Sequence, residues 1–425
     1  MKAIGIGDKR AWLTVVVGAM FYGYQFIIRV SPNVMSDDIM KAFTIDAVAF
    51  GLIVSVYYWS YSALQIPLGI MMDRLGPKKL IAGACALCGI ACFMFASTTD
   101  VYIASFARLL MGTGSACGFL GSLKLGSIWV HPKKFGSAIA ITYGFGTVGA
   151  AVGGTPLRML NDTLGWQFSL NLLGVIGFIL AILVLVIIRS SPYSIKAQEK
   201  ERIADAKKGQ TLFFGLKLVG KRYQSWLIAG YGMLMYVPLT LMGDAWGAPF
   251  MITSHNIDDK YAATFITTMF IGAAFGAPFF TLLSDYLERR IEPMLIGALG
   301  ALMAYLLIIY VHDLPLTVIY ILFFLGGFCY SAKALSFATA CEVVPRSQSG
   351  VAIGFNNMVV MTTGIVFHPM VGYLLNWNWD KSIVNGAPHY AIADYKLALT
   401  VIPVSLILAI IILKFIRETH PGKLH

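Results

Sequence analysis

Apolar runs long enough to cross a bilayer fill almost the whole chain. An α-helix needs about 20 predominantly apolar residues to span the hydrocarbon core. We predict twelve such helices, at 12–33, 47–70, 80–98, 101–123, 136–157, 167–188, 225–251, 260–283, 293–311, 316–339, 349–375 and 397–416. Only 12% of the residues are charged and 58% are apolar, against about 25% charged in a typical soluble domain. The sequence therefore predicts an all-α membrane protein.

A charged hinge occurs twice between consecutive apolar runs. The residues that we assign to it as a cytoplasmic gate are Gly69, Asp73, Arg74, Gly76, Lys78 and Lys79 in the first copy, and Asp285, Arg289 and Arg290 in the second. The repeat predicts two six-helix bundles with pseudo-symmetry, residues 1–190 and 225–425, joined by a cytoplasmic linker at 191–224. Such two-repeat membrane proteins place the substrate site near the midplane, where the repeats meet. The pattern therefore favours a transporter.

Basic residues indicate the orientation. Most of the 32 Lys and Arg residues fall in the loops of one side, and such loops are cytoplasmic. We therefore expect both termini in the cytoplasm, and the short tails and tight loops favour a bacterial inner membrane. Despite the net charge of +11, nucleic acid is not an expected partner, because the charges do not form one basic and aromatic face.

These motifs resemble those of the major facilitator superfamily over essentially the whole chain. The stretch 69–79 is similar to that family's loop signature between helices 2 and 3, and 284–290 to its counterpart in the second half. The segment 108–114 resembles the helix 4 signature, and 342–375 is similar to bacterial members grouped with nitrate and organic-anion porters. The resemblance implies that the hinge residues clamp helix ends when the cytoplasmic side is closed. The second copy has Glu288 in place of a glycine and no basic residue directly after Asp285, so we expect a weaker clamp there.

Charged residues inside the spans are the best guide to a substrate. A charge at mid-bilayer costs about 3 kcal/mol on insertion scales, so each one needs a reason. The predicted spans contain Arg29, Arg108, Lys124, Asp244 and Lys333. Four positive charges and one negative charge cannot all pair, and the positive surplus attracts anions. We predict that Arg29 and Lys333 bind a substrate carboxylate, whereas Lys124, near a helix end, can extend to the interface.

Arg29 and Asp244 occupy similar heights in the first and seventh spans, which correspond in the two repeats. We expect them to approach each other across the outer half of the cavity. They form either an outer gate or a pair in which Asp244 holds Arg29 ready for the substrate. Asp244 is also the best candidate proton carrier, because burial favours its neutral form and a nearby arginine its charged form. A fixed structural pair is the alternative. For Arg108 the resemblance implies bonds to neighbouring helices and, in some members, a part in proton coupling.

Polar and aromatic residues on the same spans complete the candidate substrate site. They are Tyr57, Tyr61, Trp246, Asn356 and Asn357. Tyr57 and Tyr61 are four residues apart and share one helix face. A lipid-facing amide lacks hydrogen-bond partners, which favours an inward position for the two asparagines. Aromatic residues also serve as lipid-facing anchors, so for each tyrosine both positions stay open.

We therefore predict a secondary active transporter that works by alternating access, with no enzymatic activity, cofactor or metal. Its expected partners are lipid, protons and a small anionic or zwitterionic solute with a carboxylate, such as an amino acid, a short peptide or an organic anion. We expect proton-coupled uptake by a monomer. The alternatives are export of a hydrophobic or siderophore-like compound, transport without ion coupling, and a receptor without flux.

Overall fold

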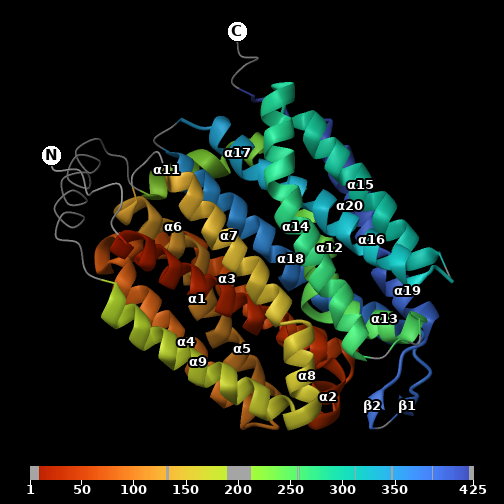
Figure 1. The fold of residues 1–425 in the computed structure, drawn as a ribbon. Helices are drawn as coiled ribbons and strands as arrows, with labels where there is room; N and C mark the ends of the chain where they lie inside the picture. The colour runs from red at the N-terminus through yellow and green to blue at the C-terminus, as the bar shows by residue number, and fades with distance from the viewer. Residues whose placement is uncertain are drawn as a thin grey trace.

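The computed structural model describes residues 9–130, 134–188, 212–255, 257, 259–311, 313–345, 348–384 and 386–420. Twelve of its helical segments are long and apolar enough to cross a membrane. The chain is an integral, multi-pass membrane protein built from two six-helix bundles, as predicted (Figure 1). The domain boundaries themselves stay a prediction, and most of the predicted linker lies outside the described residues.

The first bundle contains six spans and one short helix that follows the first span. The elements are α1 (Lys9–Val34), the short helix α2 (Ser36–Phe43), α3 (Ala47–Leu75), α4 (Pro77–Ala96), α5 (Val101–Ser115) with α6 (Cys117–Trp129), α7 (Phe135–Val152) with α8 (Thr155–Leu164), and α9 (Trp166–Ile187). The fourth and fifth spans thus each consist of two helices. The fifth span extends beyond its predicted end to Leu164.

The second bundle has the same number of spans and more interruptions. Its elements are α11 (Leu212–Gly220), α12 (Tyr223–Leu241), the π-helical turn η2 (Met242–Trp246), α13 (Gly247–His255), α14 (Asp259–Leu287), α15 (Ile291–Tyr310), α16 (Leu316–Tyr330), the 3₁₀ turn η3 (Ser331–Ala334), α17 (Leu335–Glu342), α18 (Ser349–Trp377), α19 (Ile392–Leu399) and α20 (Val401–Leu413). Two short antiparallel strands, β1 (Ile383–Val384) and β2 (Ala387–Pro388), form a hairpin in the loop between α18 and α19, with Ile383 opposite Pro388. Helix α11 lies inside the predicted linker and packs against α18.

Local chemistry explains where the first hinge turns. Gly76 ends α3 with φ 79° and ψ 147°, a conformation that is essentially restricted to glycine, and Pro77 starts α4. Asp46 begins α3 by accepting a hydrogen bond from the Ala49 amide at 2.9 Å. The connection between α3 and α4 is the single residue Gly76, and the two helices therefore run in opposite directions.

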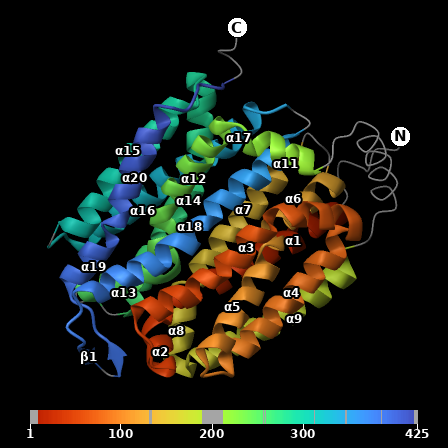
Figure 2. The ribbon, with the colours of Figure 1, turned by 180° about the vertical axis from the view of Figure 1, so that it is seen from behind.

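The two bundles meet most extensively along α3 and α18 (Figures 1 and 2). A side chain on Gly372 would reach the Ala47 carbonyl oxygen at 2.3 Å, and one on Gly51 would reach that of His368 at 2.6 Å. Backbones can approach so closely only where glycine stands at the contact. Helices α2, α8 and α19 and the hairpin lie at the same end of the molecule as these contacts (Figure 1). The bundles are therefore packed together at this end, which the sequence predicts to face outward.

Candidate functional site

An ion pair between Arg29 of α1 and Asp244 of η2 joins the two bundles. Arg29 Nη2 lies 3.0 Å from Asp244 Oδ2, and Arg29 Nε lies 3.2 Å from the same oxygen. The side chains are only 3% and 0% exposed. The Tyr58 hydroxyl accepts from Arg29 Nε at 2.9 Å and donates to Asp244 Oδ2. The contact that we predicted from the sequence is present, and Tyr58 of α3 completes it.

Asp244 lies in a π-helical turn that the opposite bundle supports. Asn33 Nδ2 donates to the carbonyl oxygens of Met242 and Gly243, both at 2.9 Å, and Asn33 Oδ1 accepts from the Ala248 amide at 3.0 Å. A π turn disturbs the regular helix hydrogen bonds, and such turns are frequent at functional sites. Sequence reasoning missed Asn33. The available signal was a polar amide four residues after Arg29, on the same helix face.

The second predicted substrate cation, Lys333, lies in the 3₁₀ turn η3. Its Nζ atom is 3.7 Å from the ring centre of Tyr236, and the Arg29 guanidinium carbon is 5.2 Å from the same ring. Cations interact favourably with an aromatic face at such distances. Among the described residues no acid forms an ion pair with Lys333, and Glu342, the acid further along the same span, bonds to Arg290. The structure thus gathers both predicted cations around one aromatic ring.

Arg108 of α5 lies behind the ion pair, in contact with α1 and α3. Its Nη1 atom donates to the Ile28 carbonyl oxygen at 3.2 Å, and its guanidinium is 5.0 Å from the ring centre of Tyr57. Within the described ranges, Arg108 Nε and Nη2 have no hydrogen-bond partner. Tyr57 donates to Gln25 Oε1 at 3.0 Å and stacks on Tyr61, with ring centres 5.9 Å apart. Arg108 therefore contacts neighbouring helices and still has donors to offer.

The two predicted asparagines lie at another depth of the junction, whereas Trp246 belongs to the same π turn as Asp244. Asn357 donates to Gln65 Oε1 across the two bundles at 2.8 Å, and Asn356 donates to Ser336 at 3.1 Å. Trp246 packs edge-on against Phe50, with ring centres 5.3 Å apart. The asparagines lie about 17 Å along α18 from His368, which borders the ion pair, at 1.5 Å per residue. They belong to a layer of their own. It is separate from the charged layer, which Arg29, Asp244 and Lys333 form.

The second copy of the hinge forms a charged cluster within one bundle. Arg290 Nη1 donates to Ser284 at 2.9 Å and to Asp285 at 3.0 Å, while Nη2 donates to Glu342 at 2.8 Å. Burial works against the charged form, but the bonds and charges of Glu342 and Asp285 raise the pKa of Arg290. Arg289 pairs with Glu292 beside them. The cluster ties the end of α14 to α15 and α17.

The first copy is described only in part. Lys78 is half-buried and Lys79 is exposed on the first turn of α4, directly after Gly76. The surroundings of Gly69 and the side chains of Asp73 and Arg74 lie outside the described part of the chain. A gate formed by these residues therefore stays a prediction.

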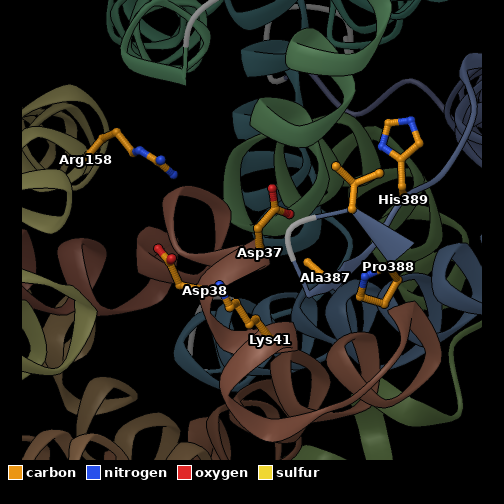
Figure 3. A pocket seen from close by; sticks show the side chains of 8 residues that line it. Asp37, Asp38, Lys41, Arg158, Ala387, Pro388 and His389 are labelled. Carbon is orange, nitrogen blue, oxygen red and sulfur yellow. The ribbon is translucent and has the colours of Figure 1, made fainter. Parts of the chain in front are cut away.

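A pocket of about 270 Å³ opens between the two bundles, at the end of the molecule that holds α2 and the hairpin (Figure 3). Its polar lining comes from α2, α8 and the end of the hairpin, namely Asp37, Asp38, Lys41, Arg158 and His389. The lining does not include Arg29, Asp244 or Lys333. The pocket is therefore distinct from the predicted substrate site.

Comparison with known proteins gives consistent matches over most of the chain. The family model of the Major Facilitator Superfamily matches residues 13–247 and again 245–425. The probable sulfoacetate transporter SauU of Cupriavidus necator is 23% identical, covering 86% of this chain and 88% of its own length. The probable galactarate/D-glucarate transporter GarP of Escherichia coli is 22% identical (87% and 89% covered). The gentisate transporter of Corynebacterium glutamicum is also 22% identical (89% and 84% covered).

Solved structures share the fold at low sequence identity. A bacterial homolog of the human lysosomal transporter Spinster, in an inward-facing and occupied conformation, superposes with a TM-score of 0.71 at 16% identity, covering 97% of this chain and 96% of its own. The nucleoside transporter NupG gives a TM-score of 0.72 at 16% identity, covering 95% and 99%. At this identity the likeness concerns the fold alone.

Proposed function

The chain belongs to the major facilitator superfamily and is a transporter rather than an enzyme, and from this premise we propose that it carries small organic anions by alternating access, coupled to protons. The observation that carries the proposal is the excess of positive charge at the junction of the bundles, where Arg29 and Arg108 are buried and Lys333 is partly buried. Arg29, Arg108 and Lys333 contribute three cations there, and Asp244 is the one carboxylate that contacts this group among the described residues. Such an excess favours an anionic ligand.

The named relatives support the same class of solute. Sulfoacetate, galactarate, glucarate and gentisate are all small organic anions, and the proteins named after them match this chain over most of its length. This favours an organic anion over the amino acids and short peptides that the sequence also allowed. It equally favours a transporter of polar solutes over an exporter of hydrophobic compounds.

Substrate binding and bundle movement are linked through Arg29. An incoming carboxylate competes with Asp244 for the same guanidinium, since both are charged acceptors of its hydrogen bonds. When Asp244 leaves Arg29, an ion pair that joins the bundles at the outer side is lost. Binding therefore favours a rearrangement of the bundles around the site, as alternating access requires. Lys333, which has no acidic partner among the described residues, provides a second contact for the anion.

Proton coupling follows from the same exchange. Two carboxylates that share a buried place cannot both stay charged at low cost, so a displaced Asp244 can take up a proton while the substrate is bound. The proton leaves when Asp244 returns to Arg29. One substrate anion and one proton thus move together, in the direction of uptake when the outside is more acidic. Arg108 holds α1 through its bond to the Ile28 carbonyl oxygen, and its remaining N–H groups can stabilise the negative charge of the substrate.

Alternating access also assigns a role to the hinge residues. We place both termini in the cytoplasm, in a bacterial inner membrane, and we expect the monomer to be the transporting unit. In this orientation Gly69, Asp73, Arg74, Lys78 and Lys79 lie at the cytoplasmic ends of α3 and α4, where they can close the inner side when the outer side opens.

The test is uptake into proteoliposomes that contain the purified protein. Radiolabelled galactarate, gentisate and sulfoacetate are compared with glutamine under an inward proton gradient, and uptake of at least one anion but not of glutamine is expected. The double variant Arg29→Gln/Lys333→Gln should lower kcat/KM for that anion by about 100-fold or more, because each lost charge contact contributes about 1.5–3 kcal/mol. Dissipating the proton gradient should end accumulation.

Lys124→Gln provides the matched control, since it also removes a positive charge from a span. This variant should retain kcat/KM within about two-fold. Anion uptake at the wild-type rate in the double variant would contradict the proposed site. Uptake that does not depend on the proton gradient would contradict the proposed proton coupling but not the proposed anion transport.

A further inference from the structure

His368 of α18 is a fully buried histidine that the mechanism above does not use. Its side chain is 0% exposed, and neither Nδ1 nor Nε2 has a hydrogen-bond partner in the described part of the chain. A neutral imidazole has one donor and one acceptor, and leaving both unpaired in the protein interior is unfavourable. His368 also lies in a span, where such groups usually mark a functional place.

The position of His368 connects it to the ion pair. Its ring lies beside Tyr58, with the ring centres 5.7 Å apart and the planes tilted by 39°. The hydroxyl of Tyr58 in turn contacts both Arg29 and Asp244. Gly51 of α3 allows this placement, because any side chain there would collide with the His368 carbonyl. His368 therefore forms the α18 wall of the charged layer.

Asp244 presents a second free group in the same layer. Its Oδ2 atom receives Arg29 and Tyr58, whereas Oδ1 has no partner among the described residues although the residue is fully buried. The charged layer thus contains two kinds of hydrogen-bonding groups that have no partner among the described residues. Arg108 offers free N–H donors, which suit a carboxylate. His368 and Asp244 Oδ1 together offer a donor and two acceptors, which a carboxylate cannot satisfy because it only accepts.

A hydroxyl group is the simplest partner for such a set, because it donates one hydrogen bond and accepts others. We propose that His368 and Asp244 Oδ1 form a hydroxyl-binding subsite, and that the transported anion is a hydroxylated carboxylate. This inference rests on the proposed function, since it places the hydroxyl group on the anion whose carboxylate binds Arg29 and Lys333. A site built to bond a substrate hydroxyl discriminates strongly against the analogue that lacks it.

The experiment compares two dicarboxylates of equal length and charge, galactarate with four hydroxyl groups and adipate with none, in the same proteoliposomes. Wild-type protein should show a kcat/KM for galactarate at least about 100-fold above that for adipate. His368→Phe keeps a ring beside Tyr58 and removes both nitrogens. It should reduce the galactarate preference by about 10- to 100-fold, the effect of one or two lost hydrogen bonds.

Two further variants separate binding from folding. His368→Gln retains a donor and an acceptor and should recover part of the preference, while His389→Phe, at the pocket beside α2, should leave it unchanged. Equal transport of adipate and galactarate, or transport of sulfoacetate alone, overturns the subsite and leaves the proposed function intact. An unchanged preference in folded His368→Phe removes His368 from the subsite. Transport of no organic anion at all overturns the proposed function itself.

Discussion

Arg29 and Arg290 are both buried arginines bonded to carboxylates, yet their surroundings differ. Arg29 reaches across the two bundles to a single carboxylate, and one oxygen of Asp244 stays without a partner in the described structure. Arg290 bonds within one bundle to Asp285 and Glu342, whose side chains are 58% and 18% exposed. A buried pair is costly to break by removing one partner, whereas an exposed pair contributes little. The difference indicates that the first pair is arranged to exchange partners and the second to hold its helices together.

The largest effect that this comparison predicts comes from Asp244→Asn. The substitution leaves Arg29 buried without a countercharge, which costs about 3–5 kcal/mol when one member of a buried pair is removed. Thermal unfolding in detergent should therefore show a clear loss of stability, and uptake should lose its dependence on the proton gradient. In Asp285→Asn, which removes an exposed carboxylate from the Arg290 cluster, the loss should stay within about 1 kcal/mol. Equal losses of stability in the two variants would contradict the proposed difference between the Arg29 pair and the Arg290 cluster.

Arg290→Lys should have a medium effect, confined to stability. The planar guanidinium serves Ser284, Asp285 and Glu342 at once, and a lysine ammonium cannot match that geometry. We expect a loss of about 1–3 kcal/mol in unfolding free energy, with the substrate KM unchanged because the cluster does not cross between bundles. A shift in KM comparable to that of Arg29→Lys, the matched change in the other pair, would show that the cluster also takes part in binding.

The smallest effect concerns pH and the tail after α20. Burial works against the charge of Glu418, but the backbone amides of Arg290, His420, Ile291 and Thr419 hold its pKa below the ordinary 4.5. A lowered pKa in the folded state stabilises the protein above pH 4.5, and this contribution disappears as the pH falls through the folded-state value. Melting temperatures measured from pH 6 to pH 3.5 should therefore decline slightly more steeply in wild type than in Glu418→Gln. Parallel curves would exclude this contribution.

The sequence was sufficient for the twelve spans and for the contact between Arg29 and Asp244. Apolar length determines the spans, and the two charges could be matched because they lie at similar heights of corresponding helices. The partners that complete the site could not be predicted from the sequence, because they depend on how the helices rotate and where they break. The pattern of residues does not show that Tyr58 and His368 lie beside the ion pair. The bond of Glu342 to Arg290 likewise depends on how the ends of α15 and α17 meet.

Some elements gave no signal in hydropathy at all. The helix α2 and the β1–β2 hairpin are too short to be recognised as spans, and they line the pocket through residues such as Lys41 and His389. The π turn at Met242–Trp246 differs from an α-helix only in its backbone hydrogen bonds, which residue patterns do not report. Asn33 becomes meaningful only once that turn is seen.

The bonds from Asn33 to the seventh span have a consequence for water. Three backbone groups of that span, at Met242, Gly243 and Ala248, obtain their hydrogen bonds from the other bundle. When the bundles separate there, these groups must find new partners, because unpaired backbone is not tolerated at membrane depth. Solvent is the available partner, so a state that is open at this end must contain water down to the level of Asn33. The protein cannot open at this place and stay dry.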